Sequence, residues 1–288
     1  MKKLSKTLKK KDLKPIERNT PMMRKIKKIG WRTKLPILRQ RFRKKVFPRG
    51  YDTQAGQYIP VNLSVGVYET EVIPLKIMDH FIDKAGTIAL IQCPCRVLMK
   101  CKNHNIDLGC VWMGKGAANL DLENLPRGAK GRFSTKEEAK IHVRAAIKDG
   151  LAPTLGKLLG DALSYNVLKY RDEFMNFCFC CSCCCITAAG KYFNSDSKNV
   201  SKRMKGVTFI TDPEKCTACG KCFKVCIYDG LKLKKGKSAH TKNCMGCGHC
   251  EIVCPNGAIS ITFDDNMDID EVMDEIIQRY EKIVDISG

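Results

Sequence analysis

The stretch that decides the fold is a cysteine pattern that occurs twice near the C-terminus: Cys216-Thr-Ala-Cys-Gly-Lys-Cys-Phe-Lys-Val-Cys226 and Cys244-Met-Gly-Cys-Gly-His-Cys-Glu-Ile-Val-Cys254. Both runs have the spacing C-x2-C-x2-C-x3-C, and Pro255 follows the second. The first three thiolates of each run lie on one tight loop, where each can reach a different iron of one cubane. The fourth lies in the next turn and points away, so we expect it to serve another cluster.

The repeated spacing predicts two 4Fe–4S clusters held by crossed ligand sets, because in two-cluster domains the fourth cysteine of a run binds the other cluster. The two predicted sets are Cys216, Cys219, Cys222 and Cys254, and Cys244, Cys247, Cys250 and Cys226. Zinc also binds C-x2-C pairs. A zinc site has no use for crossed ligands, however, so zinc is the less favoured interpretation. Paired clusters of this kind transfer single electrons.

Residues 206–265 as a whole resemble the bacterial-type two-cluster ferredoxin. The residues before the first run, 207–210, and after the second, 259–263, resemble its short strands. One departure is that Ile227 stands where Pro255 stands in the second run. Neither residue is a ligand, so this departure affects only the hydrogen bonding expected around the first loop. The resemblance implies a ferredoxin-like fold with an electron-transfer role.

Composition limits the class of protein. The 288 residues suffice for two domains or one domain with appendages, and 18 of them are cysteine. The cysteine spacing does not fit a disulfide scaffold, and no signal peptide is recognisable. The apolar stretch around 87–99 is interrupted by Arg96 and is too short to cross a bilayer. Because oxygen damages cubane clusters, we expect a reducing cytoplasm, as in an anaerobe.

The positive charge is concentrated in an N-terminal arm, residues 1–50. This arm contains 20 Lys and Arg but only Asp12 and Glu17 as acids, so it holds +18 of the net charge of +21. Its four prolines exclude one long helix. A solvated tail, docking onto a redox partner or larger oxidoreductase complex, and adsorption to an anionic membrane at the inner face all remain open. Nucleic acid is a less favoured partner, because the sequence has no recognisable nucleic-acid-binding module beside the charged arm.

Ten further cysteines form a second concentration, in the segment that we assign to a cysteine-rich module, residues 51–205. Four lie in the first half of this module and six within eight residues of its second half. They are Cys93, Cys95, Cys101 and Cys110, and Cys178, Cys180, Cys181, Cys183, Cys184 and Cys185. Adjacent cysteines point in different directions, so the six cannot all serve one metal and must be divided between sites or redox thiols.

The chain around these cysteines predicts a small α+β scaffold. Ile77, Met78, Phe81 and Ile82 form one apolar helix face, and residues 87–92 are typical of a buried strand. A second helix is expected to begin at a capping box of Ser134 with Glu137, to run to about Lys148 and to end at Gly150. Its inward residues are predicted to be Ala139, Val143, Ala146 and Ile147.

The far C-terminus, residues 266–288, predicts an amphipathic helix. Asp268 and Glu271 form its N-terminal cap, and apolar residues recur at helical spacing from Ile269 to Val284. The opposite face is acidic. We expect the apolar stripe to pack on this protein's own domains, with docking onto a partner as the alternative.

Residues from about 64 to 190, within the cysteine-rich module, resemble a poorly characterised group of anaerobe iron–sulfur proteins. The resemblance rests on Cys93-Pro-Cys-Arg96, Cys101, Leu108-Gly-Cys-Val-Trp-Met-Gly-Lys-Gly-Ala117, Glu137-Glu-Ala139, Gly150-Leu-Ala-Pro153 and the segment 178–185, followed here as in that group by a two-cluster ferredoxin domain. It implies a redox role in a larger complex and supplies no substrate.

Two chemical interpretations of the ten cysteines remain open. The first is one or more additional iron–sulfur clusters, bound by Cys93, Cys95, Cys101 and Cys110 or by some of these together with residues 178–185. The second is a zinc site with reactive thiols. Iron–sulfur is favoured because the chain already requires cluster assembly. In either case Arg96 is a candidate cofactor-binding residue, since its charge would stabilise thiolates, and an ordinary ion pair is its alternative role.

Other candidate residues carry weaker signals. His104 lies near Cys101, and His240 and His249 flank the second cysteine run, but a single histidine is more often a hydrogen-bonded neighbour than a ligand. Trp112 is expected in the core. The chain has no G-x-G-x-x-G fingerprint for a nicotinamide or flavin nucleotide.

We therefore expect an electron-transfer subunit of an oxidoreductase complex that relays low-potential electrons through two 4Fe–4S clusters and further clusters in the module. The alternative is a redox enzyme in which residues 93–185 hold a catalytic cluster fed by the chain's own ferredoxin domain. A redox sensor that binds nucleic acid through the arm ranks last.

Overall fold

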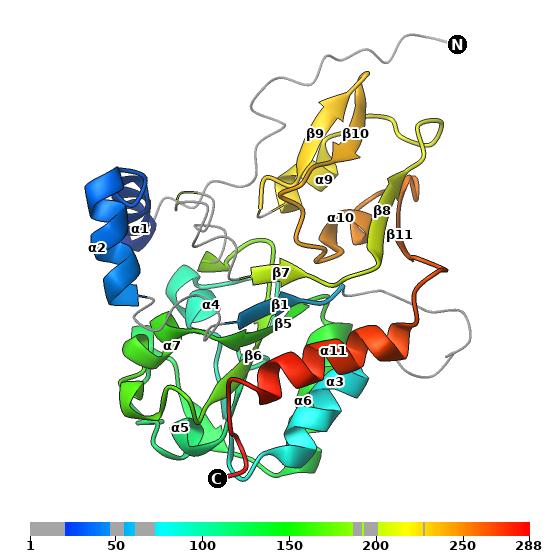
Figure 1. Cartoon of the computed structure of the whole chain (residues 1–288). Helices are drawn as coiled ribbons and strands as arrows, with labels where there is room; N and C mark the ends of the chain where they lie inside the picture. Colours follow the sequence, from blue (N-terminus) through cyan, green and yellow to red (C-terminus); the bar gives the residue numbers. More distant parts are fainter. Residues whose placement is uncertain (1–20, 47–54, 61–72, 187–191, 193–200, 227) are drawn as a thin grey trace.

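The structure is a computed structural model that describes residues 21–46, 55–60, 73–186, 192, 201–226 and 228–288 (Figure 1). The larger part of the described chain is a sheet covered by helices on both faces. A smaller lobe, built from residues 207–263, lies beyond one edge of this sheet and contains two antiparallel sheets of two strands each. The predicted α+β class, with a cysteine-rich module, a ferredoxin-like region and a final helix, is confirmed.

The large sheet has seven strands in the order β4-β2-β3-β6-β5-β1-β7. Their bounds are β1 Ala55–Tyr58, β2 Ile88–Ile91, β3 Cys110–Met113, β4 Gly131–Phe133, β5 Ala152–Lys157, β6 Met175–Cys180 and β7 Ser201–Arg203. Neighbouring strands are antiparallel except for β1 and β7, which are parallel. The strand predicted at 87–92 is β2, and its four residues are all buried.

One face of the sheet is covered by α3 (Ile73–Lys84), α6 (Lys136–Lys148) and α11 (Ile269–Glu281), as Figure 1 shows. The predicted apolar face of α3 is confirmed, because its four residues are at most 1% exposed. They are Ile77, Met78, Phe81 and Ile82. Removing this much apolar surface from water is the main force that holds the helix on the sheet.

Helix α6 begins one residue later than its predicted capping box. Thr135, not Ser134, is the N-cap, and Glu138, not Glu137, is its partner. Thr135 has extended backbone angles and its hydroxyl accepts from the Glu138 N–H, which is the geometry of a capping box. The inward residues Ala139, Val143 and Ala146 are buried, Ile147 is half-buried, and Gly150 follows the helix with φ +75°.

Helix α11 packs on this protein's own sheet, as expected. Asp268 accepts from the N–H groups of Asp270 and Glu271, so the predicted N-terminal cap is present. Val272, Met273, Ile276 and Tyr280 are buried in the same core as α3. The Tyr280 hydroxyl donates to the Leu155 carbonyl of β5 at 3.0 Å. The C-terminal segment therefore completes the core of the larger part, to which Val207 at the edge of the lobe also belongs.

The other face of the sheet is covered by shorter elements: α5 (Lys115–Ala118), α7 (Leu159–Ser164) and the 3-10 turns η1 (Pro126–Gly128) and η2 (Leu168–Tyr170). Trp112 of β3 is 1% exposed and stacks on Phe174 with ring centroids 5.1 Å apart, which confirms its place in the core. Short helix α4 (Pro94–Met99) follows β2 directly, so it holds the first cysteines at one end of the sheet.

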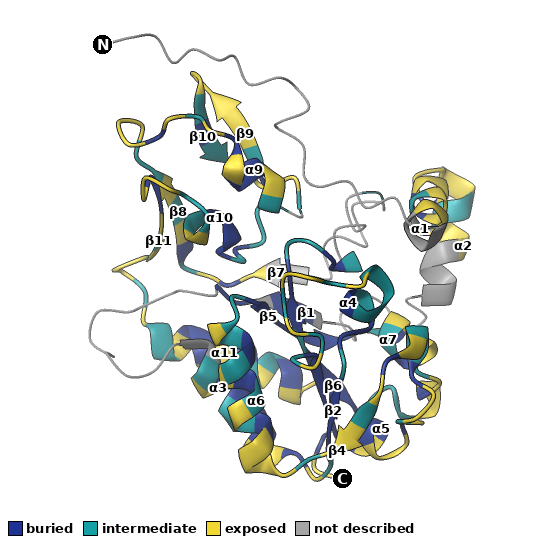
Figure 2. Cartoon of the chain, turned by 180° about the vertical axis from the view of Figure 1, so that it is seen from behind, coloured by how far each residue is buried: buried dark blue, intermediate teal, exposed yellow. Residues whose placement is uncertain are grey.

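The lobe has the two-fold repetition that the cysteine runs predict. Strands β8 (Val207–Thr211) and β11 (Ile259–Phe263) pair antiparallel, as do β9 (Leu231–Lys234) and β10 (Lys237–His240). A short helix contains the third cysteine of each run: α9 (Lys221–Val225) contains Cys222, and α10 (His249–Ile252) contains Cys250. Figure 2 shows a core of buried residues between these elements.

The basic arm contains two helices among its described residues, α1 (Pro21–Arg32) and α2 (Pro36–Val46). Each begins at a proline, which suits the first helical turn because its missing N–H would have no partner there. Both figures show these helices beside the sheet and away from the lobe. Across the described residues, no helix combines the length and apolar character needed to span a membrane.

Candidate metal centres

Two hollows in the lobe are lined by the crossed cysteine sets. The first is lined by Cys216, Cys219, Cys222 and Cys254. The second is lined by Cys226, Cys244, Cys247 and Cys250. The fold thus carries the fourth cysteine of each run to the other run's loop, and each hollow has the all-thiol donor set that an iron–sulfur cluster requires.

Backbone N–H groups support the fourth cysteine of each set. Gly230 N–H donates to Cys226 Sγ and Ala258 N–H donates to Cys254 Sγ, both at 3.2 Å. These bonds favour the charged form of the sulfur. Ile227 lies outside the described residues. The hydrogen bond from Gly230 N–H to Cys226 Sγ nevertheless has the same length as the equivalent bond from Ala258 N–H to Cys254 Sγ, next to Pro255. The departure at this position therefore leaves the support of Cys226 intact.

Two histidines adjoin the second hollow as neighbours of the sulfurs. His240 Nε2 lies 3.4 Å from Cys250 Sγ, and His249 Nδ1 lies 3.6 Å from Cys247 Sγ. Burial lowers the pKa of both rings, that of His240 to about 4. Burial also raises the pKa of the Cys222, Cys226, Cys244, Cys247 and Cys250 thiols. An apolar pocket of this kind favours a charged sulfur only when a metal neutralises it.

The ten remaining cysteines fall into three groups, and each joins the first half of the module to the second. The Cys101 tetrad consists of Cys101, Cys181, Cys183 and Cys184. The Cys93 group consists of Cys93, Cys95, Cys180 and Cys185. The Cys110 pair consists of Cys110 and Cys178, with sulfurs 3.2 Å apart. The set of Cys93, Cys95, Cys101 and Cys110 considered from the sequence is thus divided among all three groups.

Strand geometry explains this division. Alternate residues of β6 point to opposite faces of the sheet. Phe177 and Phe179 enter the core under α3, whereas Cys178 and Cys180 point to the other face. The chain turns after β6, and Cys181 packs in the core on the α3 side. The adjacent pair of Cys180 and Cys181 therefore serves two different groups.

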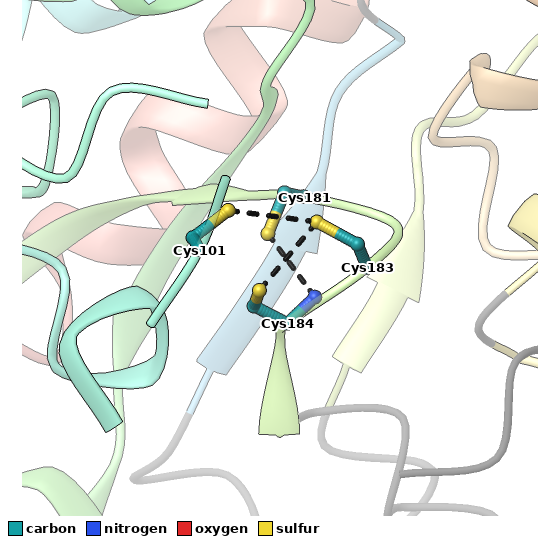
Figure 3. Close-up of side chains that lie close together, drawn as sticks. All are labelled: Cys101, Cys181, Cys183 and Cys184. Atoms are coloured by element: carbon teal, nitrogen blue, oxygen red, sulfur yellow. Dashed lines mark hydrogen bonds between the residues drawn. The ribbon is translucent and has the colours of Figure 1, made fainter. Parts of the chain in front are cut away.

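The Cys101 tetrad is compact (Figure 3). Its four sulfurs all lie within 4.8 Å of one another. Cys183 Sγ is 3.7 Å from Cys101 Sγ and 3.5 Å from Cys184 Sγ, and the Cys184 N–H donates to Cys181 Sγ at 3.3 Å. A four-cysteine group of this size can hold a metal.

The Cys93 group is more extended. Cys180 and Cys185 sulfurs are 3.2 Å apart, and Cys95 makes thiol hydrogen bonds with both Cys185 and Cys93. Thr154 Oγ1 donates to Cys180 Sγ at 3.8 Å, and Arg127 Nη1 donates to Cys95 Sγ at 3.7 Å. Four thiols with hydrogen-bond donors around them can hold a metal or a cluster.

Arg96 lies at the centre of the three groups and is fully buried. Its guanidinium donates to the carbonyls of Phe179, at 2.9 Å, and Leu108. Its pKa is raised, because the attraction of Cys93, Cys181 and Cys110 outweighs the desolvation that opposes it. No carboxylate among the described residues pairs with it. Its Nε–H lacks a protein partner. This environment suits a cation that neutralises thiolates.

Two thiols near Arg96 have lowered pKa values. Hydrogen bonding from Cys183, then the Cys184 N–H and the charge of Arg96, lower the pKa of Cys181 to about 5. Hydrogen bonding from Cys95 and the charge of Arg96 lower the pKa of Cys93 to about 7. Each of the two larger groups therefore contains one thiol whose pKa lies below the ordinary value for cysteine. Ionised sulfur is the form that binds metals.

The lobe and the module meet at sulfur atoms. Cys247, from the second hollow, packs against the buried cluster that Ala152, Cys180 and Cys185 form. The neighbouring His249 is buried and donates through Nε2 to the Gly150 carbonyl at 3.2 Å. A ligand position of the lobe thus contacts the Cys93 group directly.

Some supporting residues could not be identified from the sequence. Thr154 and Arg127 are ordinary in sequence and become neighbours of sulfur only through the register of β5 and β6 and the turn η1. Arg203, which makes a side-chain hydrogen bond with Cys244, precedes the first run and carries no motif. His104, in contrast, bonds Asp149 at 3.0 Å, which is the hydrogen-bonded role expected of a lone histidine.

Comparison with known proteins agrees with the geometry of the lobe. Residues 208–258 match the family model described as "4Fe-4S dicluster domain". The chain is also 36% identical to Ferredoxin-3 of Nostoc sp. (strain PCC 7120 / SAG 25.82 / UTEX 2576), in a match that covers 15% of this chain and 66% of that protein, just under two thirds of its length. The lobe is a ferredoxin-type 4Fe–4S dicluster domain, and such a domain implies electron transfer.

Proposed function

We propose that this chain is an electron-transfer subunit in which the dicluster domain exchanges electrons with a cluster in the cysteine-rich module. The two 4Fe–4S clusters would be held by the crossed sets that line the two hollows, and bound clusters supply one-electron transfer. The observation that carries the proposal is the packing of Cys247 against the buried cluster of Ala152, Cys180 and Cys185. This contact would place two metal centres next to each other.

The Cys93 group is the proposed site of the additional cluster. Its four thiols are less compact than the Cys101 tetrad, as a cluster of several irons requires. Arg96 and Arg127 bring positive charge to Cys93 and Cys95. Hydrogen bonds and nearby charge are the means by which proteins tune cluster potentials. These residues would thus both hold the cluster and set its potential relative to the lobe.

The chain's own residues also exclude solvent from the proposed route. Cys180 and Cys185 are 4–5% exposed, and Ala152 and His249 are buried between the two parts. Burial keeps water and oxygen from the sulfurs along the contact. The hydrogen bond from His249 to the Gly150 carbonyl, just after α6, also holds the lobe at a fixed distance from the module.

Iron content and EPR spectra of the anaerobically purified full chain test the proposal. The wild type is expected to hold clearly more than the about eight irons of two 4Fe–4S clusters. The double variant Cys180→Ser/Cys185→Ser should fall to about eight irons and keep the EPR signals of the dicluster domain. The matched variant Cys110→Ser/Cys178→Ser, which changes two cysteines of the same sheet face, should keep the additional iron.

Two results would overturn the proposal. One is a wild-type chain with only about eight irons, which would leave the Cys93 group without a cluster. The other is substrate turnover at an iron with an open coordination position in the module. That result would make the chain an enzyme with its own ferredoxin domain rather than a relay.

We further propose that the basic arm attaches the subunit to an acidic redox partner. Exposed apolar side chains among its basic residues, Trp31 at 62% and Ile37 at 72%, support a docking role. Flotation with vesicles that contain phosphatidylserine tests this proposal. The full chain and a chain without residues 1–46 should both stay with the buffer, whereas flotation of the full chain alone would assign the arm to a membrane.

A further inference from the structure

The Cys101 tetrad differs in size from every other set of cysteines in the described part of the chain. It is the one group of three or more potential ligands there whose atoms all lie within 4.8 Å of one another. The ferredoxin sets that line the two hollows do not meet this limit. The same structure therefore contains two sets of thiols that are wider than this limit and one compact set within it.

This size corresponds to a single ion. A tetrahedral ion with Zn–S bonds of about 2.3 Å places its sulfurs about 3.8 Å apart. The observed separations of 3.7 Å and 3.5 Å from Cys183 Sγ to its two neighbours are close to that value. A cubane binds each thiolate to a different iron, so its four sulfurs stand on the outside of the cluster and much farther apart.

The surroundings fit a divalent ion with four thiolates, which has a net charge of −2. Cys181 and Cys184 are buried, and the positive charge of the buried Arg96 guanidinium attracts Cys181. The Cys184 N–H already donates to Cys181 Sγ. One positive charge and one N–H donor thus act on the sulfurs before any metal is bound. Metal ligands are oriented and stabilised by neighbouring groups of this kind.

We propose that the Cys101 tetrad binds one Zn²⁺ ion as a closed structural site. Zinc is preferred to ferrous iron by such ligands in the Irving–Williams order, and four thiolates leave no open position. The ion would fasten the segment after α4 to the turn after β6. Because Zn²⁺ is not redox-active, the Cys101 tetrad would take no part in electron transfer. The inference therefore does not depend on the proposed relay.

Metal analysis of the full chain with a matched pair of variants tests the assignment. The wild type should contain about one zinc per chain, and zinc X-ray absorption should show four sulfurs at about 2.3 Å. Cys101→Ser should lose most of this zinc and retain the EPR signals of the dicluster domain. Cys110→Ser, which removes a thiol of the same module outside the tetrad, should retain the zinc.

A measurement on the unmutated chain covers the case in which Cys101→Ser does not fold. Protein produced with Co²⁺ in place of zinc should show the visible d–d bands and sulfur-to-cobalt charge-transfer bands of a tetrahedral thiolate site. Loss of iron instead of zinc in Cys101→Ser, iron–iron scattering assigned to the tetrad, or zinc with nitrogen or oxygen ligands would each overturn the proposal.

Discussion

Arg96 is the residue whose role is most dependent on the cysteines around it. It is fully buried and satisfies the carbonyls of Phe179 and Leu108. Arg96→Met should lower Tm by roughly 6 °C or more, because unsatisfied buried carbonyls cost about 1–3 kcal/mol each. It should also weaken metal retention in the module, since the thiolates lose their counter-charge.

Arg96→Lys separates these two effects. It keeps the positive charge but cannot reproduce the two-carbonyl geometry. We expect metal content close to that of the wild type together with a lower Tm, measured by circular dichroism under argon. Equal metal loss in the Lys and Met variants would contradict an electrostatic role for Arg96.

Ala218 is a second informative residue, because its backbone lies in the left-handed region with φ +53°. The equivalent position of the second run is Gly246, with φ +78°. A side chain costs about 1 kcal/mol in this conformation, which glycine adopts freely. Ala218→Gly should therefore stabilise the lobe by up to about 1 kcal/mol, seen as slower thermal loss of the iron–sulfur absorption. Gly246→Ala should accelerate that loss, and an unchanged rate in both variants would exclude strain here.

The individual cysteines show what sequence alone can predict. The crossed sets in the lobe follow from spacing within each run, because a short loop fixes where three sulfurs point. The groups in the module depend on strand register. Cys110 lies beside Cys178 because Val111 pairs with Phe177 across β3 and β6. No local pattern contains that register, so the three groups could not be assigned in advance.

At the scale of elements, helix α11 is fastened to α3 by ion pairs as well as by its apolar face. Glu281 pairs with Lys84 and with His80, whose Nε2 lies 2.9 Å from the carboxylate. Hydrogen bonds from Lys84 and then His80 lower the pKa of Glu281. A carboxyl group with a lowered folded-state pKa stabilises the fold above its ordinary pKa, and this contribution is lost as pH falls through the lower value.

Glu281→Gln should consequently reduce stability at pH 7 by about 0.2–1 kcal/mol, the range for exposed ion pairs. The difference from the wild type should shrink as the pH falls below about 4.3, the ordinary pKa of a glutamate. Thermal unfolding at several pH values checks this. Asp274→Asn, on the exposed side of the same helix, is the control and should have no comparable effect at pH 7.

The elements themselves were more predictable than the contacts between them. The apolar faces of α3 and α11 and the buried strand β2 follow from periodicity, which is a local property. The start of α6 was misplaced by one residue because Ser134 and Thr135 are both good caps, each with a glutamate three residues later. The backbone conformation at Thr135, which depends on the preceding strand β4, decides between them.

At the scale of the whole molecule, one scaffold would use cysteines in two ways, for electron transfer and for a structural metal site. The lobe and the Cys93 group form a proposed electron route that crosses from α10 to the end of β6. The Cys101 tetrad, which also adjoins Arg96, would hold the scaffold together. Helices α1 and α2 of the basic arm lie away from the lobe in both views and would leave the dicluster domain accessible to an electron donor or acceptor.

The most direct test of this account is the EPR spectrum of the fully reduced full chain, compared with that of Cys180→Ser/Cys185→Ser. Because Cys247 packs against the buried cluster that contains Cys180 and Cys185, an iron–sulfur cluster in the Cys93 group would lie close to the lobe's second cluster. For the wild type we predict EPR signals broadened by spin–spin interaction between clusters of the module and the lobe. In the double variant the spectrum should simplify to that of the dicluster domain. Identical spectra for the two proteins would contradict the relay.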